Sequence, residues 1–424
     1  MTIAELHSNE ALRQAEFPVT RTQTFFAHAG VCPLPRRVAE AMAQCALNGT
    51  VADQEEAIAR NTLSETRAVA ARLLHAQPDE IALVGPTSLG LSIVAAGFPF
   101  RKGDNILIYH DDYPANVYPW MALSAKGVEV RLMNVRELGK IRDVDVLGQV
   151  DEQTRLVALA SCHFISGWRI DLSRIGQVLH KRGIKFCVDG IQTLGALPTT
   201  VEHIDFLAAD AHKWLLGPAG AGLLYVRKGL QDLLRPPFYG WHNVNCPNFV
   251  AQEQIVFRSD ARRYEAGTAN LIGAVGLKAA LELILEVGPD AIAAELLRKR
   301  AWLVPALQAK GCAVLGAAPP PENAGAIVTF YRPGADLPAL HQTLAAAGVI
   351  TSLRTDRKGQ HYLRVSAHFY NTDAELQRLV GMLYGGFMSC RIAGGARGLK
   401  KVRDFLPHSS YPPRRESHRP PASD

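Results

Sequence analysis

Several kinds of segment are missing from this sequence of 424 residues. No apolar run approaches the roughly 20 residues that a membrane-spanning helix needs. The N-terminal stretch has neither the basic start nor the apolar core of a secretory signal. Cysteine is sparse, and its seven copies, an odd number, show no CxxC spacing. This excludes a disulfide framework and a zinc site and favours a reducing compartment, so we expect a cytoplasmic protein without a membrane span.

Net charge is also nearly absent from most of the chain. The formal net charge is +6, but the segment 391–424 holds eight Lys or Arg and three Asp or Glu, and therefore carries +5 of it. The remainder is close to neutral and offers no basic face for a nucleic acid. Because the C-terminal segment is rich in Pro, Ser and Arg, we expect a basic, disordered tail over 389–424. Its attraction to nucleic acids or membrane surfaces would be weak and salt-sensitive.

What the chain does contain is an alternation of apolar runs and helical patterns from about residue 50 to 288. Asp171 and Gly183 are suited to begin and end one of the helices. This alternation is typical of a largely parallel sheet covered by helices on both faces. The strands are expected within 80–85, 104–110, 128–135, 155–161, 185–190, 204–209 and 222–226.

The C-terminal third has a different pattern. A long apolar helix over 273–288 is followed by about a hundred residues of mixed helices and short strands, which predicts a second, smaller α+β domain. The expected organisation is an N-terminal arm with a substrate loop, a large α/β domain, the small domain and the tail, over 1–49, 50–270, 271–388 and 389–424.

Polar side chains follow the expected strands, at the edge of a parallel sheet where ligands bind. Individually these residues fit ordinary roles, because Thr-Ser pairs commonly cap helices and lysines among apolar neighbours commonly reach the surface. Together they supply an anion cradle at a helix start, an aromatic ring, a carboxylate and an amine. Pyridoxal phosphate requires this combination. The residues are Thr87, Ser88, Tyr113, Asp189, Gln192, His212 and Lys213.

Three ordered motifs make the interpretation more specific. They are VDGIQTLG at 188–195, ADAHKWLLGPAG at 209–220 and RRYEAGTAN at 262–270. Over about residues 25–383 the chain resembles the class V aminotransferases, a branch of the fold-type I pyridoxal-phosphate enzymes that includes cysteine desulfurases, selenocysteine lyases and isopenicillin-N-epimerase-like proteins. The resemblance implies an α/β fold-type I transferase with a mostly parallel sheet in its large domain and a smaller α+β C-terminal domain.

The resemblance also implies roles around the cofactor ring. Lys213 would be the catalytic lysine that forms a Schiff base with the cofactor. Asp189 would pair with the pyridine nitrogen, and Gln192 would hydrogen-bond the phenolic oxygen. Tyr113 occupies the ring-stacking position, where the family usually has His; tyrosine can stack but cannot act as an imidazole acid or base.

The resemblance also assigns residues to the cofactor phosphate and to the contact with a partner subunit. Thr87 and Ser88 would hold the phosphate, with His212 as a further donor. Thr268 would reach the phosphate of the other subunit, because the resemblance implies a homodimer with sites at its interface.

An amino-acid substrate is implied as well. Arg364 matches the family's late arginine, which binds the substrate carboxylate, and the fork geometry of a guanidinium suits that task. The segment FFAHAGVCPLP resembles an early substrate loop, so His28 and Ala29 are expected to face the substrate.

Three departures from the family pattern bear on the reaction. Asp210 stands where a phosphate-binding Ser is common, and we expect its carboxylate to turn away from the phosphate. Phe164 stands where desulfurases have Asn. In this respect the chain resembles the epimerase-like members more than the desulfurases. The segment 352–364 contains no cysteine, although a persulfide-forming desulfurase needs a thiolate on the loop before its late arginine. Cys187, directly before the Asp189 strand end, is expected to pack under the site.

The sequence leaves the reaction open. A carbanion at the substrate Cα fits an aminotransferase or a C–S lyase that eliminates a β-substituent, and also an epimerase or a cysteine desulfurase-like enzyme. An alternative of a different class is a non-catalytic binding protein with the same fold. The presence of both Lys213 and Asp189 argues against it.

Overall fold

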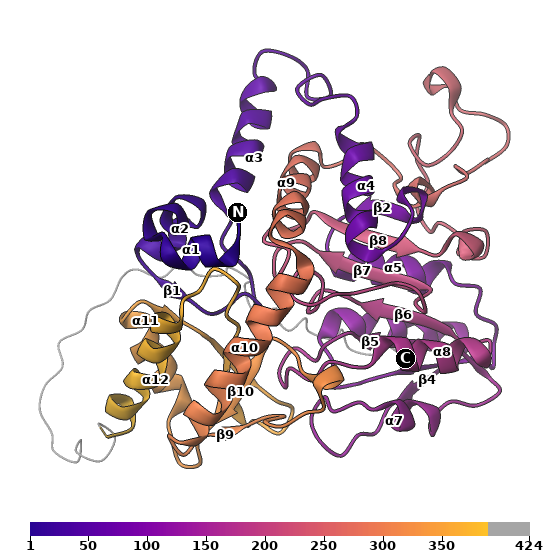
Figure 1. Ribbon diagram of the computed structural model, residues 1–424. Helices are drawn as coiled ribbons and strands as arrows, with labels where there is room; N and C mark the ends of the chain where they lie inside the picture. The colour runs from indigo at the N-terminus through magenta and orange to yellow at the C-terminus, as the bar shows by residue number, and fades with distance from the viewer. Residues whose placement is uncertain (389–424) are drawn as a thin grey trace, which may run out of the picture. The chain divides into compact units, whose positions relative to one another are not determined.

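A seven-stranded sheet forms the centre of the structure (Figure 1). This computed structural model describes residues 1–388, of which 1–387 form one compact unit; the expected tail over 389–424 lies outside the described residues. All neighbouring strands run parallel except at β8, which is antiparallel to both of its neighbours, so the expectation of a mostly parallel sheet is confirmed. In sheet order the strands are β2 (Ile81–Val84), β8 (Gly222–Val226), β7 (Phe206–Asp210), β6 (Lys185–Asp189), β5 (Thr154–Ala160), β3 (Asn105–Ile108) and β4 (Glu129–Leu132).

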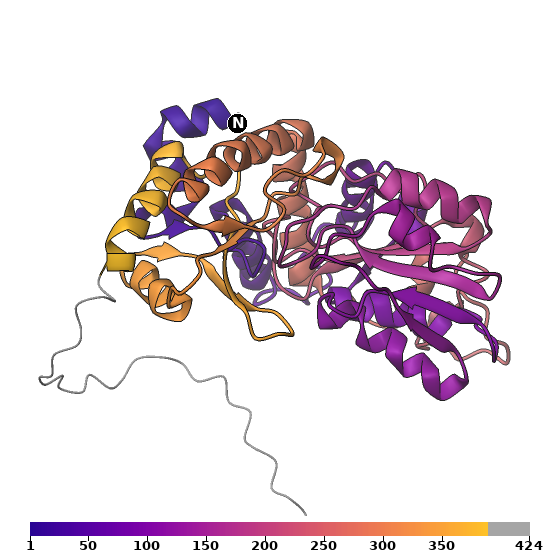
Figure 2. The same ribbon diagram turned by 90° about the horizontal axis from the view of Figure 1, so that it is seen from below.

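Helices cover both faces of this sheet, as Figure 2 shows from below. The strand side chains alternate between two cores. Val157 and Leu159 of β5 join the core that contains residues of α4 (Thr62–Leu74), α8 (Leu172–Lys181) and α9 (Leu271–Val287). Leu156 and Ala158 join the core under α5 (Thr87–Gly97) and α6 (Tyr118–Met121). Because both faces are buried, the central strands are continuously apolar, and this is why the sequence shows them clearly.

The helix boundaries follow local capping signals. The Asp171 carboxylate accepts a 2.9 Å hydrogen bond from the Arg174 backbone N–H, which confirms it as the cap of α8. Gly183, two residues beyond the end of α8, has a φ of +72°, a conformation that glycine adopts without strain. The long apolar helix begins at Leu271, capped by the Asn270 side chain, slightly earlier than the sequence predicts.

The C-terminal part is built on a four-stranded antiparallel sheet with its own core. Phe26, from the N-terminal arm, belongs to that core. The sheet contains β12 (Ser352–Thr355), β13 (His361–Val365), β10 (Val328–Tyr331) and β9 (Ala313–Val314) in that order. Its helices are α10 (Pro289–Gln308), α11 (Leu337–Ala346) and α12 (Asp373–Met388).

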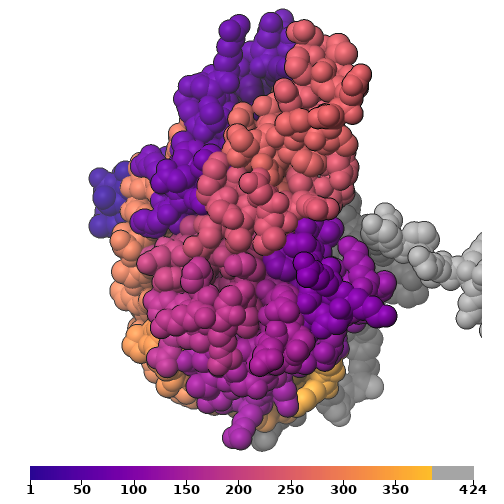
Figure 3. All heavy atoms as spheres, turned by 90° about the vertical axis from the view of Figure 1, so that its right-hand side faces the viewer, coloured from indigo at the N-terminus to yellow at the C-terminus, as the bar shows by residue number. Residues whose placement is uncertain are grey.

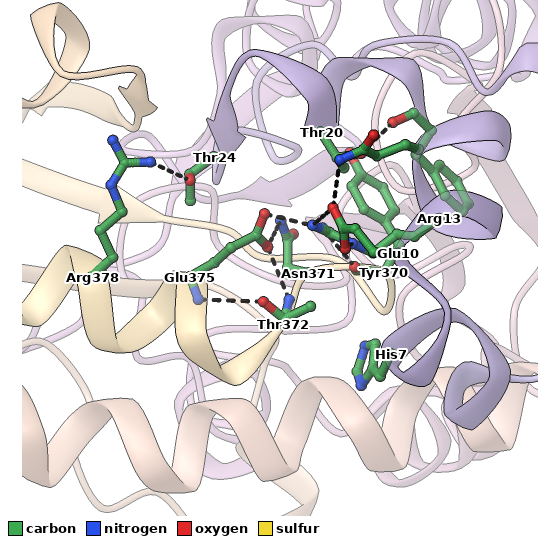
Figure 4. A network of polar contacts seen from close by, with 12 residues as sticks. His7, Glu10, Arg13, Thr20, Thr24, Tyr370, Asn371, Thr372, Glu375 and Arg378 are labelled. Carbon is green, nitrogen blue, oxygen red and sulfur yellow. Dashed lines mark hydrogen bonds and ion pairs between the residues drawn. The ribbon is translucent and has the colours of Figure 1, made fainter.

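The N-terminal arm is joined to this C-terminal part (Figure 4). Strand β1 (Thr24–Phe25) pairs in parallel with β11 (Val349–Ile350), and the short helices α1 (Ile3–Ser8) and α2 (Glu10–Glu16) precede it. Arg13 of α2 donates to the Glu375 carboxylate over 3.0 Å and to the Tyr370 carbonyl over 3.4 Å. These contacts hold α2 against the C-terminal part.

Two segments bearing exposed apolar side chains lie at the upper end in the views of Figures 1 and 3. One comprises the end of α3 (Arg36–Asn48) and the residues that follow it, and the other is the loop 238–256. The remaining helix of the large part is α7 (Asp143–Leu147). The exposed apolar side chains of the two segments are Leu47, Val51, Phe238, Tyr239, Trp241, Phe249, Val250, Ile255 and Val256.

Within residues 1–388, no helix combines the length and the apolar character needed to cross a membrane.

Candidate active site

A cavity of about 320 Å³ opens beyond the carboxyl ends of the parallel strands, as expected for this sheet type. Nine of the eleven site residues expected from the sequence line it, whereas His28 and Thr268 do not. The nine are Ala29, Thr87, Ser88, Tyr113, Asp189, Gln192, His212, Lys213 and Arg364.

Lys213 supplies the only primary amine among the residues that line this cavity. It lies three residues after the end of β7, and its side chain is buried. Burial lowers the pKa of Lys213 to about 8, and the nearby Asp189 carboxylate opposes that shift. A substantial fraction of the amine is therefore neutral near physiological pH, as attack on an aldehyde requires.

Asp189 ends β6 and is almost completely buried. Burial raises the pKa of this carboxyl group, while a 3.0 Å hydrogen bond from the Ile191 backbone N–H and the charge of Lys213 act in the opposite direction. A protonated ring nitrogen placed here would gain a carboxylate partner in a site of low dielectric constant, where ion pairing is strong.

A second buried carboxyl group, Asp112, lies beside Asp189. Burial and the Asp189 charge raise the pKa of Asp112 to about 7. Its oxygens accept hydrogen bonds from the Tyr113 N–H (2.7 Å), the Asn116 amide (3.0 Å) and the Ala160 N–H (3.1 Å). Asp112 therefore fixes the backbone from which the Tyr113 ring projects into the cavity.

The Gln192 amide is oriented by two neighbours. Its oxygen accepts a 3.0 Å hydrogen bond from the Trp214 indole, and its nitrogen donates to the Ala29 carbonyl over 3.1 Å. These bonds assign the nitrogen and the oxygen of the amide, and they leave one N–H free to donate to an acceptor in the cavity.

The start of α5 forms the anion-binding side. Thr87 is its first residue, and among the described residues no side chain caps this terminus. The backbone N–H groups and dipole of a helix start favour a phosphate. Because Thr87 Oγ1 accepts a 2.9 Å bond from the Asp210 N–H, the helix start is tied to the end of β7.

Asp210 orients His212. Its carboxylate lies 2.8 Å from His212 Nδ1 and accepts hydrogen bonds from the N–H groups of Ala211 and Gly220. The carboxylate is thus occupied by these partners. With Nδ1 donating to Asp210, Nε2 of the histidine donates to an anion only when the ring carries both protons.

Arg364 is the most deeply placed cation of the site, with 1% of its surface exposed. Nη1 donates to the Phe164 carbonyl over 2.7 Å, and Nη2 lies 3.4 Å from the Ser352 hydroxyl. Burial lowers the pKa of the guanidinium, and the charge of Arg354 adds to that effect. Its Nε is buried without a hydrogen-bond partner. An unpartnered donor on a buried cation beside Lys213 suits a substrate carboxylate.

His28 lies behind the cavity wall. Its ring is completely buried, with Nδ1 2.8 Å from the Ser366 carbonyl and Nε2 2.7 Å from the Tyr370 hydroxyl. Burial lowers the pKa of His28 to about 4, so the ring is neutral. Both ring nitrogens already have partners. Of the two residues expected to face the substrate, only Ala29 lines the cavity.

Thr268 borders a separate cavity of about 250 Å³, together with Phe238 and Glu265. Glu265 forms a buried ion pair with Arg67, at 2.6 Å. Within one chain Thr268 therefore does not line the Lys213 cavity, and its expected role across a subunit interface remains a prediction.

The described cysteines lie elsewhere. None of the six within residues 1–388 lines the Lys213 cavity, and Cys390 lies outside the described residues. Burial raises the pKa of Cys32 and of Cys162 to about 12, so neither thiol ionises readily. The described part of the chain also contains no cluster of His, Cys, Asp and Glu that could hold a metal ion.

Sequence reasoning missed one charged side chain of the cavity wall. Arg354 lines the cavity with Arg364. The alternation of β12 could have indicated it, because Ser352 and Arg354 are two residues apart and share a face, but only with the register of the hairpin known.

The donor set fits pyridoxal phosphate. A buried amine, a buried carboxylate, an aromatic ring and an uncapped helix start border one cavity of suitable size. These are the groups required for its aldehyde, ring nitrogen, ring face and phosphate.

Comparison with known proteins agrees with this. The sequence model of the family described as Aminotransferase class-V matches residues 24–379. A probable cysteine desulfurase of Methanothermobacter thermautotrophicus is 29% identical over 389 residues, 86% of this chain and 94% of that protein. A probable cysteine desulfurase of Pyrococcus abyssi is 26% identical, over 87% and 95% of the two chains.

Solved structures share the fold. A cysteine desulfurase from Thermococcus onnurineus NA1 superimposes with a TM-score of 0.81 at 23% identity, covering 89% of this chain and 97% of the other. The cystine C–S lyase C-DES, in complex with cysteine persulfide, gives a TM-score of 0.78 at 24% identity, over 87% and 98% of the chains. With the family match and the donor set together, the chain belongs to the aminotransferase class-V family and is a pyridoxal-phosphate-dependent enzyme.

Proposed function

We propose that this enzyme acts on a free amino acid by removing the proton from its α-carbon, as a transferase of the aminotransferase type or as a C–S lyase. The observation that carries this proposal is the convergence of Lys213, Asp189 and Arg364 on one cavity. It brings together an amine, a carboxylate for the cofactor ring and a buried guanidinium for a substrate carboxylate.

The cofactor would be held by residues already described. Lys213 would bind its aldehyde carbon, Asp189 its ring nitrogen and Tyr113 one ring face. Thr87 and His212 would receive the phosphate. When bound, pyridoxal phosphate supplies a protonated ring that accepts the electron pair left at the substrate α-carbon.

The chain's own residues would then orient the substrate and move its proton. Arg364 would bind the α-carboxylate through its free Nε and an adjacent Nη, in the paired geometry that carboxylates favour. Once released from the cofactor, the Lys213 amine would accept the α-proton. Its pKa of about 8 suits a base that works near neutral pH.

The absence of a thiol among the described cavity residues argues against a persulfide-forming desulfurase. Elimination of a β-substituent needs no enzyme thiol, so this absence is compatible with a C–S lyase. The relatives named cysteine desulfurases and the similar cystine C–S lyase favour a sulfur-containing substrate. Transamination and epimerisation remain alternatives at the same α-carbon.

We further propose that the enzyme is a homodimer. The exposed apolar side chains of the loop 238–256 offer a surface for a second copy, and Phe238 joins that loop to the cavity of Thr268. Large exposed apolar patches usually mark such interfaces. A second copy covering them would bring Thr268 near the partner's cofactor phosphate.

A panel of amino acids tests the reaction. The purified holoenzyme is mixed with each amino acid, the cofactor absorption is followed, and the products are identified. A lyase releases sulfide, pyruvate and ammonia from cysteine. An aminotransferase converts the cofactor to its amine form, and a 2-oxo acid restores the original spectrum. If no amino acid changes the cofactor spectrum, the proposal is wrong.

Mass spectrometry of the protein after incubation with cysteine tests the desulfurase alternative. We expect no added sulfur atom on any cysteine. A stable adduct of one sulfur on one thiol, with activity lost when that cysteine is replaced by serine, would establish a desulfurase instead.

A further inference from the structure

Two arginines face the substrate cavity, and the function proposed above uses only one of them. Arg354 lies on β12 and Arg364 on β13 of one antiparallel hairpin. In its register Ser352 pairs with Arg364, and Arg354 pairs with Tyr362. Side chains two residues apart on a strand share a face, so the two arginines are diagonal neighbours on the face toward Lys213.

The two guanidinium groups converge on the same space. A Cβ atom placed on Gly30 would lie 3.5 Å from Nη2 of Arg364 and 3.6 Å from Nη2 of Arg354. Both groups therefore border one small volume above the Gly30 backbone. A ligand whose carboxylate contacts Arg364 there has Arg354 within reach of its other substituents.

Neither arginine has an anionic partner within residues 1–388. Arg354 Nη1 donates to the Leu353 carbonyl over 3.1 Å, and Arg364 contacts only uncharged oxygens and leaves Nε unpartnered. Buried or half-buried guanidiniums normally pair with carboxylates, as Arg67 does with Glu265 in this chain. Two unpaired cations beside one cavity indicate a ligand that brings negative charge.

The charge of the cavity leads to the same conclusion. Among its lining residues Arg354 and Arg364 carry guanidinium groups. Lys213 and the single carboxylate, Asp189, are assigned to the cofactor. The cofactor phosphate is assigned to the start of α5, so both arginines are left for the substrate. One α-carboxylate balances one of them, and a second anionic group is needed for the other.

We propose that Arg354 is a specificity-determining residue that binds an anionic group in the substrate side chain. The preferred substrates are then amino acids that end in a second carboxylate or a sulfinate. This inference rests on the proposed function, because it takes Arg364 as the partner of the α-carboxylate. The guanidinium fork provides two parallel donors for each anion.

The alternative assignment has both arginines holding a single α-carboxylate. The difference in burial favours separate roles, because Arg364 is completely buried at the carbonyl of Phe164, whereas Arg354 is half-buried and reaches solvent. The two assignments also differ in an observable way. If both arginines bind the α-carboxylate, Arg354 contributes equally to the binding of every amino acid. If Arg354 binds a side-chain anion, it contributes to the binding of acidic amino acids alone.

The experiment compares amino acids that are matched in shape. Aspartate with asparagine, glutamate with glutamine, and cysteine sulfinate with cysteine are titrated into the holoenzyme. Binding is measured by the cofactor absorption and, independently of turnover, by calorimetry. Three variants are measured beside the wild type, namely Arg354→Gln, Arg354→Lys and Lys358→Gln. Lys358 is exposed on the turn of the same hairpin and outside the cavity, so its replacement removes the same charge from the chain.

For the wild type we expect at least one acidic amino acid to bind about 10- to 100-fold more tightly than its neutral counterpart, the scale of a hydrogen-bonded charge. Arg354→Gln should abolish this preference while neutral amino acids change less than about threefold. Arg354→Lys should retain part of it, and Lys358→Gln all of it. Circular dichroism and cofactor content establish that each variant is folded.

Two results would overturn the inference and are distinguishable. If the wild type binds neutral amino acids as tightly as acidic ones, or if Arg354→Gln weakens both classes equally, Arg354 has no role in side-chain selection, and the proposed function stands. If no amino acid of either class perturbs the cofactor or gives a heat of binding, the proposed function fails and the inference fails with it.

Discussion

The amine of Lys213 lies 5.1 Å from the centre of the Tyr113 ring. The lysine follows β7 and the tyrosine follows β3, so their approach depends on the sheet that places both strand ends at one edge. The family's usual histidine is absent at this position, and Tyr113 offers a ring face with no imidazole. Under the proposed function, proton transfer at the substrate α-carbon would therefore fall to Lys213.

The first prediction concerns cofactor attachment. Borohydride reduction of the holoenzyme should fix pyridoxal phosphate on Lys213, and the Lys213→Ala variant should retain no covalent cofactor, because no other primary amine lines the described cavity. Peptide mass spectrometry measures this. The exposed Lys228 provides a control, since Lys228→Ala should be labelled like the wild type. Label on another lysine of the wild type would refute the assignment.

The second prediction is a pH dependence. Only the neutral amine attacks an aldehyde, and burial lowers the pKa of Lys213 from 10.5 to about 8. The rate at which the apo-protein captures pyridoxal phosphate should therefore rise up to about pH 8 and level off above it. Stopped-flow absorbance measures the rate. A rate that climbs steadily to pH 10 would show an ordinary, solvated lysine.

The third prediction concerns Asp189. The change Asp189→Asn preserves size and an acceptor for the Ile191 N–H, but removes the charge that, in the proposed site, would keep the cofactor ring protonated. Turnover should fall by at least about 100-fold, the scale of proton-transfer catalysis. Covalent cofactor should be retained at wild-type stoichiometry. Near-normal turnover in this variant would make Asp189 a structural residue.

The fourth prediction concerns assembly. Phe249 is 78% exposed in the loop 238–256, and Phe249→Glu should shift the proposed dimer toward monomer in light scattering. The control is Val144→Glu on α7, an exposed apolar position outside that loop, which should leave the mass unchanged.

Loss of the dimer should also speed the release of cofactor on dilution, and Thr268→Ala should do so without changing the mass. A wild-type monomer that retains its cofactor at high dilution would contradict the role proposed for Thr268.

Much of the fold could be predicted from the sequence because the relevant signals are local. The central strands are buried on both faces and are therefore continuously apolar, and Asp171 caps a helix through its own side chain. Direction is not local: the run over 222–226 shows a strand but nothing that makes β8 antiparallel. The strand expected over 204–209 is shifted to Phe206–Asp210, and Asp205, directly before it, bonds Phe186 through both its carboxylate and its backbone N–H.

The same difference between local and non-local signals decides which site residues could be predicted. The strand ends position Lys213, Asp189 and Gln192, so the topology of a parallel sheet predicts that they meet. Arg354 was missed because its orientation depends on the register of a hairpin. Asp356 and Gly359 mark the turn between its strands, but they do not show which side chains face the cavity. His28 and Ala29 are neighbours in an irregular loop, where no periodicity tells which of the two faces the cavity.

The pairing of β1 with β11 has a consequence for synthesis. Ala29, four residues after β1, lines the cavity, and β1 is held by β11 and by Arg378 from near the other end of the described chain. During translation the wall of the cofactor cavity cannot close until those late residues have left the ribosome. Until then the Lys213 side remains open, so a nascent chain would exchange cofactor freely and retain it only after release.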